Sequence, residues 1–377
     1  MSQTSSLSIT SHFADLEDPR VLRTRRHNLL DILVIAISGV ICGAESWVEI
    51  EKYGKSKQAW LATILPLPNG IPSHDTFGRV FAQLDPRHFH ECFARWITSL
   101  HEATAGRLIG IDGKTLRHSF DTGLGKGPLH MVSAWAAANH LVLGQVAVAD
   151  KSNEITAIPE LLRLLDLHGA IVTIDAMGCQ KEIAKQIVEA GGDYVLAVKG
   201  NQESLEAAVI KLCAESLDNQ FADIKHSAYE TEEKSHGRQE TRTYYALPVP
   251  QDFACKDAWK GLRSLGMAFR VCQQAGKPEE IRVRYYISSM SPNAQKMAAA
   301  IRGHWGIENS CHWVLDVSFR EDESRIRKDH GPANMGQLRR LALSLLKSTT
   351  ALKGGVHAKR LQAGWNNENL IKVLLGS

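Results

Sequence analysis

The sequence lacks the patterns of a disulfide framework, a zinc finger and a membrane span. Its seven cysteines are odd in number, and no two of them form a CxxC pair. They therefore predict reduced thiols in an intracellular protein. The longest apolar run, residues 29–42, carries Asp31 and is shorter than the roughly 20 residues that a membrane helix needs. The sequence thus predicts a buried helix here, no membrane partner and a cytoplasmic location.

The sequence also lacks a strong charge of either sign. The 44 lysines and arginines against 41 acidic residues leave a net charge of +3, which is too small to indicate a nucleic-acid partner by itself. Internal repeats and low-complexity tracts are absent, and hydrophobic residues make up an ordinary 44%. The length predicts two to three domains. Any DNA-binding surface must therefore come from local clusters of basic residues.

The chain begins with a polar segment and a helical one. Residues 1–28 end in a basic run and predict a flexible N-terminus, whereas residues 29–104 predict a helical domain. Ser73 is a good N-cap for a helix with Asp75 in its first turn and Arg79 off the apolar stripe. A short helix after a tight loop is compatible with a helix-turn-helix-like DNA contact. A small helical bundle packed on a catalytic domain explains the same pattern equally well.

The hydrophobic period changes near residue 107, where strand-like stretches begin. Strands are predicted at 107–112, 130–138, 141–149, 169–175 and 193–198, with helices at 156–167 and 181–190. This order predicts an α/β (α+β) fold, a mixed sheet with helices on its faces. The core of this fold is assigned to residues 105–213 and 289–350.

A β-rich insertion interrupts this core at residues 214–288, with strands predicted at 243–247, 267–272 and 281–288. Ser291 and Pro292 then predict the N-cap and first residue of a helix that runs through Glu308. A last amphipathic helix covers residues 335–347, and residues 351–377 form a C-terminal tail or helix.

Two aspartates, Asp112 and Asp175, each follow an apolar strand. The ends of strands in such a sheet present ligands at a rigid edge. Cleavage of a phosphodiester by two metal ions needs hard oxygen ligands of this kind. A single aspartate after a strand is more often a turn or capping residue, so the interpretation depends on a third carboxylate.

Glu308 supplies that third carboxylate. On a helix, His304, Glu308 and His312 are spaced i, i+4, i+8 and share one face. Two histidines and a glutamate can also bind zinc, so a zinc-dependent hydrolase is the alternative. The absence of an HExxH motif and the lack of a role for either strand-end aspartate argue against it.

Six short motifs give the chain a resemblance to a known family over nearly its whole length. They are 72–77 (PSHDTF), 111–114 (IDGK), 173–176 (TIDA), 198–202 (VKGNQ), 236–238 (HGR) and 304–309 (HWGIEN). The chain resembles the DDE insertion-sequence transposases, and among them the H-repeat-associated proteins linked to Rhs elements. Each motif alone is weak evidence, but together they are highly specific.

The resemblance implies a ribonuclease H-like catalytic core and action on the DNA ends of a mobile element and on target DNA. It implies that Asp112, Asp175 and Glu308 are the catalytic residues and bind Mg²⁺, with Mn²⁺ as an alternative ion. Water would cleave the strand and the freed 3′-hydroxyl would attack the target. Joining two DNA ends implies a dimer on DNA. A decayed transposase that only binds DNA is the second alternative.

The chain departs from a related branch that has a tyrosine, an arginine and a lysine around the glutamate. Those positions are Ile301, His304 and Leu315 here, and Arg302 is only a weak substitute. About half of the basic residues near the C-terminal side of Glu308 are expected to be structural, because acidic residues interleave with them. The predicted DNA contacts are Lys114, Lys199, Asn201, Gln202, Arg302, His304, Asn309, His312, Arg325 and Arg327.

Overall fold

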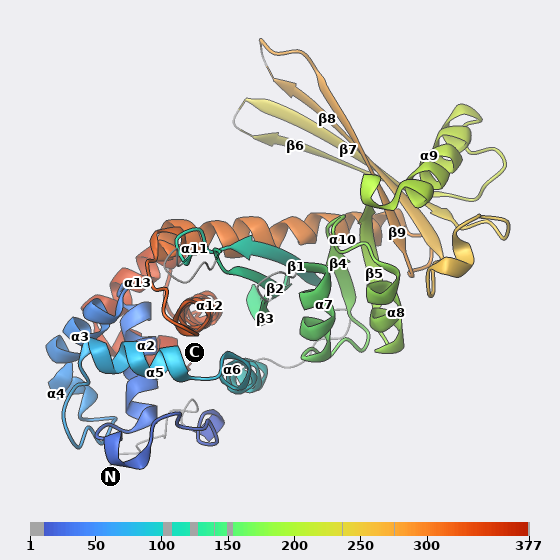
Figure 1. The fold of residues 1–377 in the computed structure, drawn as a ribbon. Coiled ribbons are helices and arrows are strands. Elements are labelled where there is room, and N and C mark those ends of the chain that lie inside the picture. Colours follow the sequence, from blue (N-terminus) through green and yellow to red (C-terminus); the bar gives the residue numbers. More distant parts are fainter. Residues whose placement is uncertain are drawn as a thin grey trace. The chain divides into compact units, whose positions relative to one another are not determined.

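The computed structural model describes residues 11–100, 108–120, 127–138, 140–148, 154–235, 237–274 and 276–375. The first ten residues of the predicted N-terminal segment, His236 of the HGR motif and the predicted strand ends at 107 and 149 lie outside this part. The chain divides into two compact units. The first comprises Met1–Ala103, Gly113–Ser152 and Glu308–Ser377, and the second Thr104–Asp112 and Asn153–Ile307. Figure 1 labels their elements.

The first unit is mostly helical. Its described elements are η1 (Leu22–Thr24), α2 (Leu29–Ile41), α3 (Trp47–Ser56), α4 (Gln58–Leu61), α5 (His74–Gln83), α6 (Pro86–Leu100), β2 (His130–Ala136), β3 (Leu141–Ala147), η5 (Glu308–His312), α11 (Trp313–Phe319), η6 (Glu321–Glu323), α12 (Gly331–Ser348), α13 (Val356–Trp365) and α14 (Asn367–Leu375). The apolar run predicted as a buried helix is α2, which is buried from Asp31 to Ile41. No helix in the described ranges has the length and apolar character needed to cross a membrane.

Helix α12 forms the centre of the first unit. All of its residues from 331 to 346 are buried, and it packs against α2, α5, α6 and β3. The amide of Asn334 donates to the carbonyls of Phe81 and Leu84 at 2.7 and 2.9 Å, which joins the start of α12 to the end of α5. The predicted cap of α5 is also present, because the Ser73 hydroxyl accepts the Thr76 N–H at 3.4 Å.

The second unit is built on a mixed sheet. Its elements are the first part of β1 (Leu108–Thr115), α7 (Glu154–Arg163), β4 (Ile171–Ile174), α8 (Lys181–Glu189), β5 (Asp193–Val198), η3 (Gly200–Gln202), α9 (Glu203–Asp218), β6 (Ser227–Ser235), β7 (Arg238–Pro248), η4 (Lys256–Ala258), β8 (Ser264–Gln274), β9 (Glu280–Ser288) and α10 (Ala294–Ile307). The strand order in this unit is β1-β4-β5-β9-β8-β7-β6. Pairing is parallel among β1, β4 and β5 and antiparallel beyond. The predicted mixed α/β fold is confirmed.

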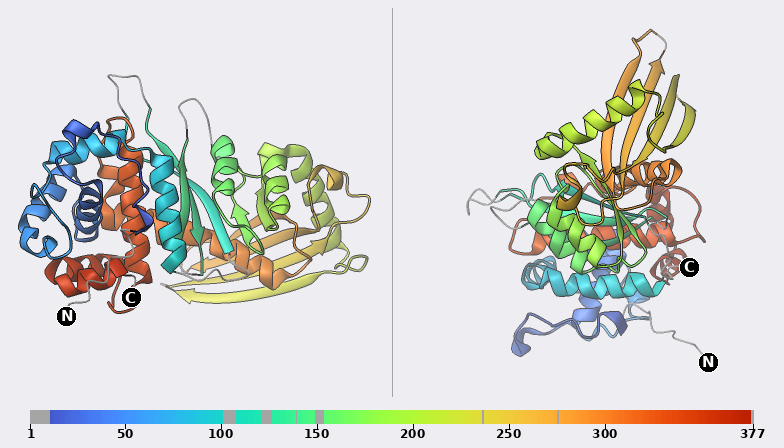
Figure 2. Two further views of the ribbon diagram at one scale, coloured as in Figure 1. Left: turned by 90° about the horizontal axis from the view of Figure 1, so that it is seen from below. Right: turned by 90° about the vertical axis from the view of Figure 1, so that its right-hand side faces the viewer.

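Helices cover both faces of the parallel strands (Figure 2). Helices α7 and α8 pack against each other, and α8 packs on β5. Helix α10 lies on the other face and buries Met297 and Ile301 against the strands. Successive residues of a strand point to opposite faces, and Thr173 accordingly meets α10 while Ile174 lies on the side of α7. The α10 face of β4 is therefore the face that positions the site described below.

The sequence analysis missed one strand of this unit and misplaced both ends of one helix. Strand β6 was not predicted, because most of its residues are exposed and polar and leave no apolar period to detect. The cap of α10 was assigned to Ser291 and Pro292, but the Asn293 side chain accepts the Lys296 N–H at 2.9 Å and the helix begins at Ala294. Asparagine caps helices as well as serine does. Helix α10 also ends at Ile307, and Glu308 begins a π-helical turn.

His90 of α6 gives the first unit a pH-dependent stability. Its ring is buried, and neither ring nitrogen has a hydrogen-bond partner among the described residues. Burial lowers the pKa of His90 to about 4. Below pH 6.5, the ordinary pKa of histidine, the unfolded chain therefore binds a proton at His90 that the folded chain does not. The free energy of unfolding thus falls as the pH drops from 6.5 towards 4.

We expect His90→Leu to reduce the pH dependence of the free energy of unfolding. Between pH 7.5 and pH 5 the variant should lose about 2 kcal/mol less free energy of unfolding than the wild type, as follows from about 1.4 kcal/mol per pKa unit. Urea titrations at the two pH values measure the difference. His357→Leu, at an exposed position, is the matched control. Equal pH dependence in the wild type and His90→Leu would contradict the assignment.

Candidate active site

Asp112 and Asp175 occupy equivalent positions on two adjacent parallel strands. The register pairs Gly110 with Thr173 and Ile111 with Ile174, so the two aspartates are the next residues along β1 and after β4. Neighbouring strands lie about 4.8 Å apart, and both aspartates are half-buried. By strand alternation they share the face of Gly110 and Thr173, which is the face covered by α10.

The turn after β4 orients Asp175. Its Oδ1 accepts the backbone N–H groups of Met177 and Gly178 at 3.1 and 3.4 Å. A Cβ at Gly178 would lie 2.2 Å from Ile174 Cγ2, so a side chain at that position would collide with the strand that the turn follows. Glycine therefore keeps the turn tight and keeps the Asp175 carboxylate next to the end of β4.

The loop after β5 clamps the same turn. Asn201 donates from Nδ2 to the Ala176 carbonyl at 2.6 Å, and Gln202 donates from Nε2 to the Cys179 carbonyl at 3.0 Å. Both amides were predicted to contact DNA, and in the structure they hold protein backbone. Lys199, which precedes them, has an exposed side chain without a side-chain partner in the part of the chain that the structure describes.

His304 connects α10 to the strand that carries Asp175. Its Nδ1 lies 3.2 Å from the Thr173 hydroxyl, which itself donates to the Ile109 carbonyl at 3.4 Å. Since the hydroxyl proton is used in that bond, Nδ1 is the donor to Thr173. Burial lowers the pKa of His304 and the Asp175 charge opposes the shift only in part, so the ring is neutral. No signal in the sequence marked Thr173 as its partner.

Helix α10 lies against β1 near Gly110. The main chain of His304 passes 3.7 Å from the place where a Cβ on Gly110 would stand. This contact and the Thr173 bond place the last turns of α10 over the strands two residues before each aspartate. Glu308 follows directly on Ile307, the last residue of α10, and its side chain is exposed.

The geometry of residues 308–312 differs from the predicted helical face. Glu308 and His312 were predicted on one helical face, but they lie at the two ends of a π-helical turn, where Glu308 is exposed and His312 is buried. Within the described ranges, no group of three or more histidine, cysteine, aspartate or glutamate side chains is gathered as a metal-ion site. Asp112 and Asp175 belong to the second unit and Glu308 to the first.

Several predicted DNA contacts are engaged with protein groups. Lys114 is 9% exposed, and its ammonium lies 2.6 Å from Asp316 and 3.1 Å from Asp322. Acidic residues such as Asp322 interleave with basic ones in the sequence, and this pattern indicates ion pairs within the protein. Arg302 forms an ion pair with Glu233 at 2.9 Å on the exposed side of α10. These lysine and arginine charges are balanced within the protein.

The remaining predicted contacts lie in the first unit. Asn309 and Arg325 are exposed, whereas His312 is buried. Arg327 donates to the His118 carbonyl at 3.2 Å, and its guanidinium stacks over the Phe120 ring at 4.6 Å. Arg325 is therefore the most accessible of the predicted cations in this unit.

Comparisons with known proteins cover most of the chain. The family model described as "Transposase DDE domain" matches residues 104–345, and the model "DDE_Tnp_1-associated" matches residues 10–97. "Putative transposase YncI" of Escherichia coli O157:H7 is 44% identical over 370 residues, which cover 97% of this chain and 94% of that protein. "H repeat-associated putative transposase YhhI" of Escherichia coli (strain K12) is 42% identical over 376 residues, which cover 98% of each chain.

A third relative is shorter. "H repeat-associated putative transposase YbfD" of Escherichia coli (strain K12) is 44% identical over 245 residues, which cover 65% of this chain and 95% of that protein. The resemblance predicted from the six motifs is confirmed, and the ribonuclease H-like fold is that of the DDE domain. The chain belongs to the DDE transposase family, together with the H repeat-associated proteins.

Proposed function

We propose that the protein is an active transposase that cleaves and joins DNA strands at the ends of its element with Asp112, Asp175 and Glu308. The observation that carries the proposal is the pairing of Asp112 and Asp175 at equivalent positions on adjacent parallel strands. Glu308 directly follows α10, and His304 of that helix contacts the strand that carries Asp175. The three carboxylates are proposed to act together in the reaction.

The donor set fits a hard divalent cation. Two aspartates on rigid strands and a glutamate offer only oxygen ligands, which Mg²⁺ prefers and Mn²⁺ accepts. Asp112, Asp175 and Glu308 would hold the ions. Bound there, two such ions would activate the attacking oxygen and stabilise charge on the leaving oxygen.

The chain's own residues would orient the reacting groups. The turn amides of Met177 and Gly178 hold one oxygen of Asp175, which fixes the direction of the carboxylate. The neutral His304 ring adds no positive charge beside it. Lys199, exposed at the end of β5 next to β4, is the cation placed to contact a phosphate of the DNA.

The test requires the DNA on either side of the coding region to be searched for inverted repeats, which then serve as the substrate. Purified protein should nick a duplex that carries these repeats when Mg²⁺ or Mn²⁺ is present, leave 3′-hydroxyl ends and stop in EDTA. Crosslinking on this duplex should reveal a dimer. Binding without nicking would instead support the DNA-binding-only alternative. Stoichiometric, tightly held zinc in the purified protein would support the hydrolase.

Asn201→Ala should lower the cleavage rate without weakening DNA binding. The variant loses the bond to the Ala176 carbonyl that holds the turn bearing Asp175, and loss of such a supporting contact typically costs about 10- to 100-fold. Single-turnover cleavage and duplex binding in EDTA are the two measurements. Asn219→Ala, an exposed amide paired with Asp223, is the control. Weaker binding with an unchanged cleavage rate would show that Asn201 contacts DNA instead.

A further inference from the structure

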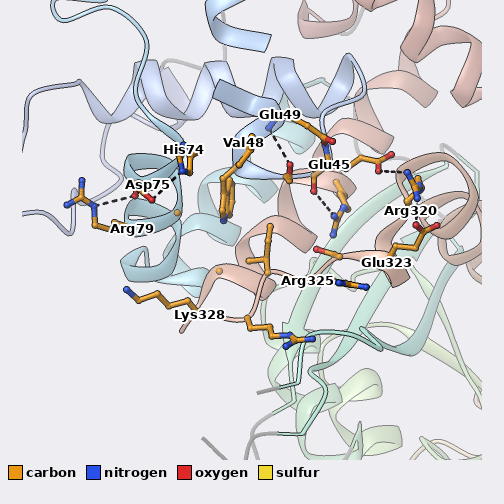
Figure 3. Close-up of a pocket in the computed structure, with 18 residues that line it drawn as sticks. Glu45, Val48, Glu49, His74, Asp75, Arg79, Arg320, Glu323, Arg325 and Lys328 are labelled. Carbon is orange, nitrogen blue, oxygen red and sulfur yellow. Dashed lines mark hydrogen bonds and ion pairs between the residues drawn. The ribbon is translucent and has the colours of Figure 1, made fainter. Parts of the chain in front are cut away.

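The first unit contains a pocket of about 590 Å³ whose lining includes neither Asp112 nor Asp175 (Figure 3). Its walls come from the start of α3, the first turns of α5, the segment 320–331 and Arg339 of α12. Trp47 forms part of the wall and stacks on Phe81 at 4.9 Å. All of these residues lie within one compact unit, so the pocket is a feature of that unit alone.

Cationic side chains surround this pocket. Six lysines and arginines line it, against four aspartates and glutamates. Figure 3 shows Arg79 and Lys328 towards one side of the view and Arg320 and Arg325 towards the other. Arg320 is paired with Glu45 and Glu323. Among the described residues, Arg325 and Lys328 have no acidic partner, and both are exposed.

Arg339 adds a buried charge to the same wall. The residue is 2% exposed, and its guanidinium donates to the Glu45 carbonyl at 3.3 Å. No carboxylate within ion-pair distance faces it in the described part of the chain. Burial accordingly lowers the pKa of Arg339. A buried guanidinium held by one long bond leaves donors available for an anionic group that enters the pocket.

The segment that carries Arg325 and Lys328 is held in place at both ends. Arg320 and Asp329 adopt left-handed backbone conformations, with φ of 47° and 44°, which residues other than glycine adopt at a cost and which cluster at ligand-binding segments. Glu321 pairs with the buried Arg340, and the His330 N–H donates to the Ala82 carbonyl at 3.2 Å. The cations are therefore presented on a preorganised loop.

We propose that this pocket binds the phosphodiester backbone of DNA, with Arg325 and Lys328 as its outer contacts and Arg339 as its inner one. The proposal rests on the proposed function, since it assigns the chain a surface for the DNA on which it acts. Cations spread along two sides of a pocket suit successive phosphates of a strand better than a single small anion. Contacts of this kind position the duplex and do not read its sequence.

The test compares the affinity of the full-length protein for a fluorescein-labelled duplex in EDTA across a range of salt concentrations. Arg325→Ala/Lys328→Ala should bind about tenfold or more weakly at low salt, and its slope of log Kd against log salt should be smaller by about 2. Both side chains are exposed, so folding should be retained, as circular dichroism will verify. Lys211→Ala/Lys353→Ala, which removes two exposed lysines elsewhere, is the matched control and should bind as the wild type does.

Acetylation footprinting of the unmodified protein gives an independent measurement. Bound duplex should protect Lys328 from acetylation and leave Lys353 reactive. If the double variant bound DNA with the wild-type affinity and salt slope, or if Lys328 stayed reactive in the presence of DNA, the pocket assignment would be wrong. Cleavage by the same preparation would still support the proposed function. Salt-dependent binding at the pocket without cleavage under any divalent ion would support the pocket and overturn the function.

Discussion

Asp175→Asn is expected to lower the rate of strand cleavage by about 10³-fold or more. A metal ion at such a site supplies several kcal/mol of transition-state stabilisation, and each 1.4 kcal/mol is a factor of ten in rate. Asparagine keeps the oxygen that accepts the Met177 and Gly178 N–H groups, so the turn should survive and only the charge is lost. Single-turnover cleavage of the repeat-bearing duplex measures the effect, and duplex affinity in EDTA should stay close to that of the wild type.

Asp166→Asn is the matched control for this change. The Asp166 carboxylate accepts the N–H of His168, just as the Asp175 carboxylate accepts the N–H of Met177. Asp166 differs in that it is exposed. The control should cleave at the wild-type rate. Asp112→Asn and Glu308→Gln should each reproduce the Asp175→Asn loss.

A double variant tests whether the carboxylates act as one site. Residues that work as a unit show strongly non-additive losses, so Asp112→Asn/Asp175→Asn should be little worse than either single change. Multiplied losses would mean that the two aspartates serve separate sites. Normal cleavage by Asp175→Asn would remove the basis of the proposed mechanism.

The order of the elements was predictable wherever a hydrophobic period was present. Strand β5 was predicted within its observed bounds, and β4 and α8 nearly so, because each has one apolar face or a continuous apolar run. Strand β6 was missed because its exposed, charged residues carry no such period. The π-helical turn at Glu308 was missed because its sequence continues the α-helical pattern, and only packing in the fold selects the wider turn.

The adjacent positions of the two candidate aspartates were predictable, and the contacts that surround them were much less so. Asp112 and Asp175 could be paired because both follow apolar runs, and the sequence predicted that both strands end there. Only Asp175 follows the end of its strand, since β1 continues past Asp112 to Thr115. Lys114 was read as a DNA contact, but its two partners lie about 200 residues further along the chain. The Thr173–His304 bond likewise joins residues 131 positions apart. Such pairs arise from tertiary packing, which a local pattern does not encode.

Arg340→Met is expected to lower the free energy of unfolding of the first unit by about 3–5 kcal/mol, the usual cost of removing one partner of a buried ion pair. Arg340 and Glu321 have fully buried side chains 2.7 Å apart. Arg340 also donates to Ser133 and to the Gly336 carbonyl. Its loss would leave the Glu321 carboxylate buried without its main cation. Glu321→Gln should be destabilising for the converse reason, and urea unfolding followed by tryptophan fluorescence measures both.

The double variant Glu321→Leu/Arg340→Met separates the cost of an unpaired charge from the value of the pair itself. Replacing a whole buried pair by apolar side chains is often neutral, because the desolvation of two ions offsets their attraction. The double variant should therefore be more stable than either single one. Glu323→Gln breaks the exposed pair with Arg320 in the same segment, and it should leave the unfolding midpoint unchanged. If the double variant were as unstable as Arg340→Met, the hydrogen bonds to Ser133 and Gly336 would carry the stability of this region, and the ion pair would not.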